Sequence, residues 1–351
     1  MYFVKLYEVM ILKAENIPLV SICIPTYNRG RYLERSLLAY EKMQEFVEKK
    51  IEIVISDNAS TDDTRERIEP FVRKYSNVVY HRNEKNIRDE NFPLVMSLGN
   101  GVLHKLVHDN FIISQCGMSV ICDAVDVYRS TKPVLFFDNG NSDRVNTPIK
   151  SVYEVEVFLS LIGYWITWSG GISLWHEECV NLAKRIEWCN LHLWQVGMIC
   201  RMIHKKNYGV VIHRAFGHIC EVQNKDVSYG IVKVFHDNYL YILKEFYKEG
   251  ILSNKCIDFL EKDMLYGYFT KRIFYKDCNL DGNLIYGNGK CLKEEVYEAY
   301  KDKDYFSHYL FYYKRFYIMA YFIRAINVFL DVKKARYVIK NIFDKIKCIG
   351  G

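Results

Sequence analysis

The sequence predicts an α/β fold in which a mostly parallel sheet is flanked by helices and followed by a helical C-terminal extension. Two observations predict the sheet. Short apolar runs rich in β-branched residues alternate with segments whose apolar residues recur every three or four positions, as in helices. Polar clusters follow the apolar runs, where turns are expected. From about residue 228 onward only the helical pattern continues, which predicts the extension.

The first strand is predicted at Val20–Ile24, a run that is apolar except for Ser21, too short for a helix and typical of a strand buried on both faces. Pro25 lacks an N–H group and is expected to end this strand. Apolar residues then recur at helical spacing through Tyr32–Phe46. The remaining strands are expected at Ile51–Ile55, Asn77–His81, Leu103–Val107 and Val134–Phe137. The remaining helices of this part are expected at Asp62–Tyr75, Asn91–Leu98 and Gly117–Tyr128.

The composition is that of a globular chain. Its 351 residues accommodate one large or two smaller domains, half of the residues are hydrophobic, and the net charge is +6. Eleven cysteines occur without a C-x-x-C pair, which argues against a zinc site or a disulfide framework and favours a reducing compartment. The first residues lack signal-peptide features, and no apolar run reaches about 18 residues, so we expect neither a signal peptide nor a transmembrane helix.

Polar clusters follow four successive predicted strands. They are Thr26–Asn28, Ser56–Asp63, Arg82–Asn86 and His108–Asn110. If these strands are parallel, the clusters share the carboxyl edge of the sheet, where open α/β sheets bind ligands. Each cluster alone is ordinary turn chemistry, because Asn, Asp and Ser favour turns in any protein. Together the clusters predict a polar ligand site.

Two of these clusters carry a specific resemblance. Pro25–Arg29 reads PTYNR and Ser56–Thr64 reads SDNASTDDT, and this pairing resembles a family 2 glycosyltransferase of the GT-A fold. The segment Asn83–Phe92 resembles the next block of that family, with Arg88 where a glycine is usual. The resemblance covers about residues 18–121 and fades beyond them.

The resemblance implies a Rossmann-like GT-A glycosyltransferase domain over residues 18–225, with a nucleotide-sugar-binding half (18–121) and an acceptor half (122–225). A helical, basic region (226–351) would follow. The resemblance also implies a nucleotide-diphosphate sugar donor, an inverting transfer to a saccharide or lipid-linked acceptor, and usually Mn²⁺ or Mg²⁺. We expect this reaction to serve the biosynthesis of a bacterial surface polysaccharide, either lipopolysaccharide or capsule.

The donor is expected at the ends of the first strands. In the resembling family the acid at position 57 contacts the base, and a carboxylate can accept hydrogen bonds from a uracil or guanine edge or from ribose hydroxyls. An Asx turn or a helix cap is the alternative role of Asp57. Tyr27 can pack on the base. The complete set of expected donor-binding residues is Pro25, Thr26, Tyr27, Asn28, Asp57, Asn58, Arg82, Lys85, Arg88, His108 and Asp109.

The metal expectation rests on Val107–Asn110, which lies where the family places its Asp-x-Asp motif. His108 and Asn110 replace the two acids, and Asp109 lies between them. Side chains alternate along an extended segment, so a local twist is needed for Asp109 and Asn110 to bind Mn²⁺ or Mg²⁺ together, which is our prediction. Alternatively, His108 shifts the preference towards Mn²⁺. In a third alternative metal is dispensable and the diphosphate is neutralised by Arg82, Lys85 or Arg88.

An inverting transfer also needs a general base within hydrogen-bond reach of the attacking hydroxyl. Family members often carry an acid at the start of a helix that follows a glycine-bearing loop. Here the loop is expected at Ser169–Gly171 and the helix near Asn190–Ile203, which contains no acid. We therefore predict Glu187 as the base, with His192 as the next candidate. A solvated helix face is the alternative role of each.

Two further features concern partners. All five tryptophans lie between Trp165 and Trp194, and aromatic faces stack on sugar rings, which suits a saccharide acceptor, although a packed core is the alternative. The last helix carries basic residues on one side and apolar residues on the other, so it is predicted either to bind a membrane surface or to pack on the protein itself. We expect a cytoplasmic location. If this helix binds a membrane surface, the protein is expected to be attached peripherally to the inner face of the cytoplasmic membrane. The basic side of the helix is formed by Lys333, Arg336, Lys340 and Lys347.

Other classes of function are less well supported. A catalytically silent sugar-nucleotide-binding or scaffold protein is the main alternative, because the metal motif is altered and the helix acid is missing. A dinucleotide-dependent Rossmann enzyme is disfavoured because no G-x-G-x-x-G follows the first strand. We expect no nucleic-acid partner, since the basic residues concentrate in the tail instead of along the sheet edge.

Overall fold

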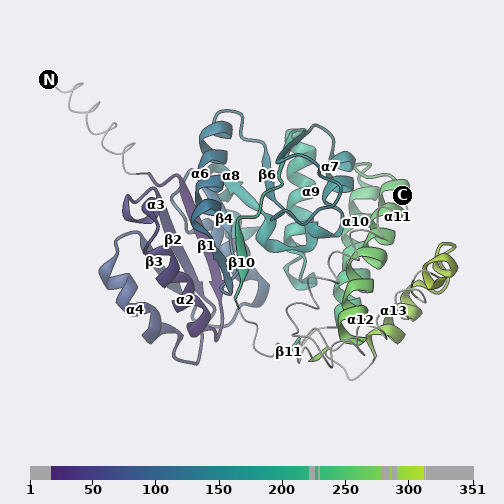
Figure 1. Ribbon diagram of the computed structural model, residues 1–351, viewed down its shortest axis with the longest axis horizontal. Helices are drawn as coiled ribbons and strands as arrows, with labels where there is room; N and C mark the ends of the chain where they lie inside the picture. The colour runs from purple at the N-terminus through teal and green to yellow at the C-terminus, as the bar shows by residue number, and fades with distance from the viewer. Residues whose placement is uncertain are drawn as a thin grey trace, which may run out of the picture. The chain divides into compact units, whose positions relative to one another are not determined.

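The computed structural model describes residues 17–220, 226–227, 230–277, 285–286, 291–311 and 313. The chain divides into two compact units, Met1–Val222 and Gln223–Gly351. The N-terminal unit is the α/β part, with the mostly parallel sheet that the sequence predicts (Figure 1). The predicted fold class is therefore confirmed. The predicted division into donor and acceptor halves stays a prediction.

The central sheet of the N-terminal unit has the strand order β3-β2-β1-β4-β8. The first four strands in the chain pair in parallel and β8 is antiparallel to β4. Every residue of β2 is buried, which accounts for its mainly apolar sequence, because a central parallel strand is covered on both faces; the buried exception within Ile51–Ile55 is Glu52, which accepts from Ser21 Oγ. The bounds are β1 Val20–Thr26, β2 Ile51–Asp57, β3 Val78–Arg82, β4 Leu103–Leu106 and β8 Ser173–Trp175.

Pro25 does not end the first strand as predicted, because β1 continues to Thr26. The backbone carbonyl of Cys23 accepts from Val107 N on the β4 side, whereas that of Thr26 accepts from Asn58 N on the β2 side. Pro25 faces the β4 side, like Cys23, and the pairing of β1 with β4 stops at Cys23. The missing N–H group of Pro25 therefore removes no hydrogen bond from the sheet.

Helices connect these strands. The predicted helix Tyr32–Phe46 is divided into α2 (Gly30–Tyr40) and α3 (Gln44–Val47). The apolar residues that recur at helical spacing are buried from Leu33 onward, namely Leu33, Leu37, Tyr40, Met43 and Phe46. The other helices that connect the parallel strands and follow them are α4 Thr64–Lys74, α5 Asn91–Ser97 and α6 Gln115–Tyr128. Apolar side chains of α2, α4 and α6 pack with those of β1 and β2 in one core cluster.

The rest of the N-terminal unit forms two smaller sheets. The predicted strand Val134–Phe137 is present as β6, but it belongs to a separate sheet of order β6-β9-β7, so Asp138 does not join the edge formed by β1–β4. In that sheet β7 is Ile149–Val152 and β9 is Gly209–Ile212. The second small sheet has two antiparallel strands, β5 Phe111–Ile113 and β10 Gly217–Ile219. The helices here are α7 Val155–Ile162, α8 His176–Cys179 and α9 Trp194–Lys206.

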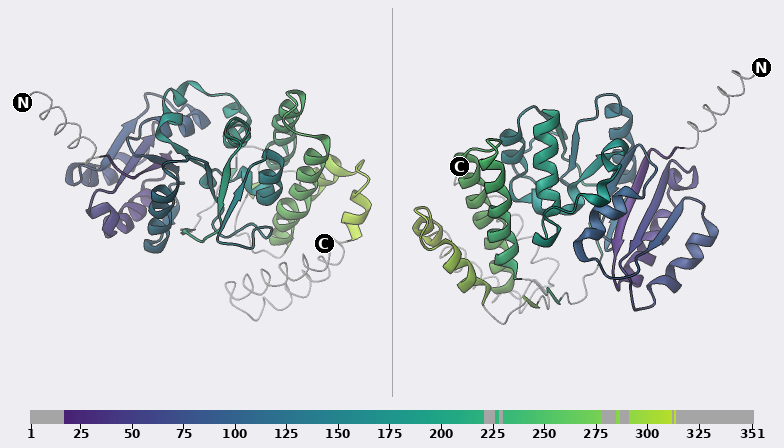
Figure 2. Two further views of the ribbon diagram at one scale, coloured as in Figure 1. Left: turned by 90° about the horizontal axis from the view of Figure 1, so that it is seen from above. Right: turned by 180° about the vertical axis from the view of Figure 1, so that it is seen from behind.

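The C-terminal unit is mainly helical in its described residues, and α10 packs against α11 (Figure 2). No helix among the described residues is long and apolar enough to cross a membrane. The predicted basic helix with Lys333 and Lys347 lies outside the described residues. The helices are α10 Tyr239–Lys248, α11 Asn254–Asp263, α12 Thr270–Asp277 and α13 Leu292–Tyr300, and a short parallel pair joins β11 Asp226–Val227 to β12 Ile285–Tyr286.

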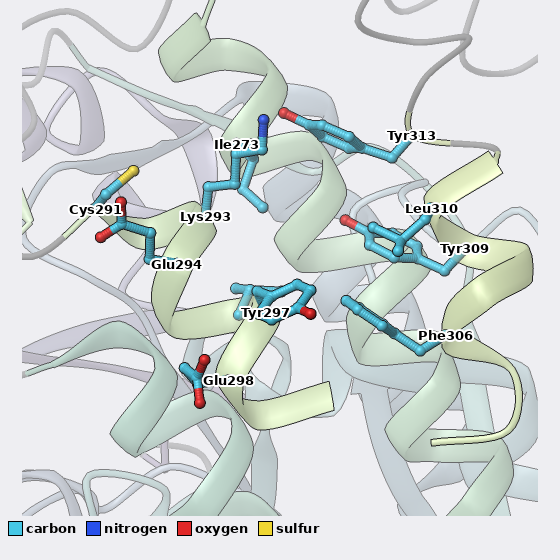
Figure 3. Close-up of a pocket in the computed structure, with 11 residues that line it drawn as sticks. Ile273, Cys291, Lys293, Glu294, Tyr297, Glu298, Phe306, Tyr309, Leu310 and Tyr313 are labelled. Carbon is cyan, nitrogen blue, oxygen red and sulfur yellow. The ribbon is translucent and has the colours of Figure 1, made fainter. Parts of the chain in front are cut away.

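The C-terminal unit contains a cavity of about 390 Å³. Aromatic side chains from the end of the described chain line one side of it, among them Phe306, Tyr309 and Tyr313, and Tyr297 of α13 faces them (Figure 3). This cavity belongs to the C-terminal unit alone.

A lysine lies deep in the central sheet of the N-terminal unit. Lys105 of β4 is fully buried, and its ammonium group donates to the carbonyl oxygens of Leu106 and Ile172, at 3.2 Å each, and to that of Gly170. Three carbonyls match the three N–H donors of an ammonium group. Burial lowers the pKa of Lys105 to about 7. The side chain ties β4 to the loop that contains Ser169–Gly171.

This lysine predicts a pH-dependent stability. The unfolded chain holds the Lys105 proton up to its usual pKa near 10.4, whereas the folded chain releases it around pH 7, so the free energy of unfolding rises with pH between these values. The free energy of unfolding of wild type, relative to that of Lys105→Met, should rise by about 2 kcal/mol from pH 7 to pH 9, as measured by urea denaturation. Lys42→Met, at an exposed position, is the control. Parallel stability curves of wild type and Lys105→Met would contradict this account.

Candidate functional site

The carboxyl ends of β1, β2 and β3 lie side by side at one edge of the central sheet (Figure 1). Thr26 is paired with Asp57 in the ladder, and Asp57 is paired with Arg82. The turn His108–Asn110 follows the neighbouring parallel strand β4. The polar clusters therefore share one edge, as the sequence predicted.

Asp57 is fully buried at the end of β2. Its Oδ1 accepts from the backbone N–H of Ser60 at 2.8 Å, and its Oδ2 accepts from the Tyr80 hydroxyl at 2.6 Å. Partial burial and this hydrogen bond raise the pKa of Tyr80, so the tyrosine stays a donor. Arg82 Nε lies 3.7 Å from the same Oδ2. A nucleotide base that contacts Asp57 must replace one of these partners, and the base-binding role stays a prediction.

Asn58 organises the loop that follows β3. Its side-chain nitrogen donates to Asn86 Oδ1 at 2.9 Å and to the carbonyl of Arg88 at 3.1 Å, and its side-chain oxygen accepts from Ile87 N at 2.8 Å. Arg88 has a φ of 55°, a conformation that glycine adopts most easily. This backbone conformation accounts for the glycine that is usual at this position in the resembling family.

The loop after β1 is tied to the loop after β2. Asn28 N donates to Ser60 Oγ at 2.9 Å, and Thr61 N donates to Asn28 Oδ1 at 2.7 Å. Tyr27 is 42% exposed next to this link, so its ring is available for stacking. The three cations predicted for this edge, Arg82, Lys85 and Arg88, are also exposed.

Residues 108–110 form a turn, so the chain departs here from the extended geometry, as the predicted local twist required. Phe111 N donates to the carbonyl of His108 at 3.0 Å, which closes the turn. Asp109 is 5% exposed and is directed to the β1–α2 loop, where its Oδ2 accepts from Thr26 Oγ1 at 3.1 Å and its Oδ1 lies 3.0 Å from Arg29 Nη1. The ring of His108 instead contacts Ser169 Oγ at 2.8 Å. The alternating side-chain geometry assumed from the sequence therefore does not apply.

The contacts of Asp109 do not favour a divalent cation on its carboxylate. The Asp109 carboxylate already forms an ion pair with Arg29, and two cations on one carboxylate repel each other. His108, the other metal-ligating residue of the motif, is directed to a different loop. Among the described residues no group of three or more His, Cys, Asp or Glu side chains could hold a metal ion.

The two predicted bases differ in their surroundings. Glu187 is exposed in the loop before α9. His192 Nδ1 lies 3.0 Å from Oδ2 of Asp89, and this hydrogen bond raises the pKa of His192. Asp89 belongs to the loop organised by Asn58, so the pair joins the carboxyl edge of the sheet to the start of α9. Sequence reasoning missed Asp89 because 103 positions separate it from His192.

The glycine loop and the tryptophans lie mostly inside the fold. Gly170 and Gly171 are buried, as are Trp175 and Trp194. Trp168 packs on the rings of two phenylalanines, with centroids 5.8 and 6.0 Å away. For most of these aromatic residues a packed core is therefore the role that the structure shows, and the saccharide-binding role stays a prediction.

Comparisons with known proteins locate the family signal in the same region. Residues 21–88 match the family model described as Glycosyl transferase family 2. Abequosyltransferase RfbV of Salmonella typhimurium is 47% identical over 85 residues, which are 24% of this chain and 25% of that protein. The uncharacterized glycosyltransferase MG025 homolog of Mycoplasma pneumoniae is 36% identical over 62 residues, 18% of this chain and 20% of that protein. The chain thus spans a quarter or less of the length of these curated relatives.

A solved structure extends the similarity in fold. S. aureus TarS, residues 1–349 in complex with UDP-GlcNAc, superimposes with a TM-score of 0.51 at 17% identity, over 72% of this chain and 72% of that chain. At this identity the likeness concerns the fold, and it agrees with the GT-A arrangement expected from the sequence.

Proposed function

We propose, because residues 21–88 match the model of glycosyl transferase family 2, that the chain is a glycosyltransferase. It moves a sugar from a nucleotide-diphosphate donor to a saccharide or lipid-linked acceptor, with inversion, in lipopolysaccharide or capsule biosynthesis. The observation that carries the proposal is the single carboxyl edge at which Thr26, Asp57 and Asp109 meet. The relative named abequosyltransferase supports a sugar-transferring role. The cytoplasmic or membrane-peripheral location stays a prediction.

The donor lies along this edge in the proposal. Asp57 and the exposed ring of Tyr27 hold the base, by hydrogen bonding and by stacking. Asn58 keeps the loop of residues 83–88 in place beside the base. Exposed cations on the same edge, among them Arg82 and Lys85, face the negative charge of the donor.

His192 is the better-supported general base. A neutral imidazole that donates its Nδ1–H to the Asp89 carboxylate has its lone pair on Nε2, where it can accept a proton. The acceptor hydroxyl gives its proton to Nε2 and its oxygen attacks the anomeric carbon opposite the leaving diphosphate, which inverts the configuration there. Asp89 is a positioning residue in this scheme. Glu187 remains the second candidate, and no step depends on Mn²⁺ or Mg²⁺.

Donor binding is tested by a thermal-shift screen of UDP-, GDP-, CMP- and dTDP-sugars, each with and without Mn²⁺. A donor at 100 times its Kd stabilises the folded chain by about 2.7 kcal/mol, which raises the melting temperature by roughly 4 °C for a chain of this length. Asp57→Asn should abolish the shift, because a contact to the base is lost. Asp126→Asn on α6 is the matched control and should keep it. No shift with any donor would overturn the proposal.

The general base is tested by comparing His192→Gln with Glu187→Gln in a donor-turnover assay. His192→Gln should lower kcat by about 10²–10⁴-fold with donor affinity unchanged, and Glu187→Gln should stay within about 2-fold of wild type. Since Asp89 raises the pKa of His192, Asp89→Asn should move the acidic limb of the kcat–pH profile to lower pH. The reverse pattern would assign the base to Glu187. Donor binding without turnover in wild type would indicate the catalytically silent alternative.

A further inference from the structure

Arg29 and Asp109 form an ion pair across the sheet edge. Arg29 Nη1 lies 3.0 Å from Asp109 Oδ1, and the two side chains are 25% and 7% exposed. Arg29 belongs to the loop between β1 and α2, and Asp109 belongs to the turn between β4 and β5. The pairing of β1 with β4 places this loop and this turn next to each other.

Both partners of this pair are held in place by other contacts. The hydroxyl of Thr26 donates to Asp109 Oδ2 at 3.1 Å, and Ser36 Oγ donates to the backbone carbonyl of Asp109 at 3.2 Å. The guanidinium carbon of Arg29 lies 5.8 Å from the centroid of the Tyr32 ring, within cation–π range. Arg29 is therefore oriented before any ligand arrives.

A divalent cation on Asp109 would have to share the carboxylate with this guanidinium. Like charges at that distance oppose each other, and partial burial weakens the screening by water. His108, the residue before Asp109 in the motif, contacts Ser169 and is not directed to the place where Asp109 meets Arg29. The side chains of His108 and Asp109 therefore point to different loops, and the Asp109 carboxylate is already paired with Arg29.

We propose that Arg29, held by Asp109, binds the diphosphate of the donor in the place where a divalent cation was expected. This inference rests on the proposed function. A guanidinium has five N–H donors in a planar fork, so a contact with one carboxylate oxygen is compatible with charge-assisted hydrogen bonds to phosphate oxygens. As the sugar leaves, negative charge grows on the diphosphate, and a fixed cation stabilises that charge without reorganisation.

Arg29 is distinguished from the three cations predicted for this edge by its ion pair with Asp109. The exposed residues Arg82, Lys85 and Arg88 were the cations predicted for this role from the sequence. Of these, Arg82 donates to the backbone carbonyl of Ser60 beside Asp57. Arg29 is the one that lies against Asp109, at the motif position where the charge of a metal was expected.

The test compares nucleoside diphosphates with their nucleosides. The affinities of UDP, GDP, CDP and dTDP, and of uridine, guanosine, cytidine and thymidine, are measured by calorimetry in EDTA and again in Mn²⁺. Wild type should bind one nucleoside diphosphate with the same affinity, within about 2-fold, in both conditions. Arg29→Gln should lose at least about 10-fold in diphosphate affinity and should keep its affinity for the nucleoside. Arg65→Gln, at an exposed position of α4, is the matched control and should behave as wild type.

The outcomes separate the inference from the function on which it rests. Diphosphate binding that requires Mn²⁺, or that Arg29→Gln leaves unchanged, overturns the role of Arg29 and leaves the glycosyltransferase proposal standing. Absence of binding by every nucleotide and nucleoside overturns the proposed function and the inference with it. If Arg29→Gln does not fold, Arg29→Lys takes its place, because lysine keeps the charge beside Asp109 but lacks the planar fork. A loss of diphosphate affinity between about 2-fold and 10-fold in Arg29→Lys supports the proposal, and an unchanged affinity overturns it.

Discussion

The parallel pairing of β1 with β2 on one side and β4 on the other is the constraint on which the site depends. It places Thr26 between the two acids of the edge: the backbone of Thr26 is in register with Asp57, and its hydroxyl donates to Asp109. Both acids lie at strand ends that a parallel sheet must bring together. Tyr27 and Arg29 lie in the loop that follows β1, and Asn58 lies in the loop that follows β2, so the strand ends fix where these loops begin.

The two acids of the edge are in different electrostatic situations. Asp57 accepts hydrogen bonds from neutral donors, an N–H group and the hydroxyl of Tyr80, with Arg82 more distant. A base edge also offers neutral N–H donors, so it can replace those partners without a change in charge. Asp109 is paired directly with Arg29. One acid of the edge thus has neutral hydrogen-bond partners and the other has a cationic partner, which is compatible with the base and the diphosphate of the proposed donor.

Local patterns sufficed to predict the central strands and the shared edge, because a mainly apolar strand such as β2 is stable only when it is buried. Local patterns did not predict the turn at Asp109, since a single hydrogen bond from Phe111 to His108 decides between a turn and an extended segment. Nor did they predict pairs formed by long-range packing. Arg29 and Asp109 are 80 positions apart, and His192 and Asp89 are 103 apart.

The most direct test of the central claim is hydrogen–deuterium exchange of the full chain with and without UDP or GDP. The account predicts slower exchange of the backbone amides in Thr26–Arg29, Asp57–Thr61 and His108–Phe111, which lie at the shared edge. Protection confined to the C-terminal unit, for example to the cavity that Tyr297 and Phe306 line, would contradict it.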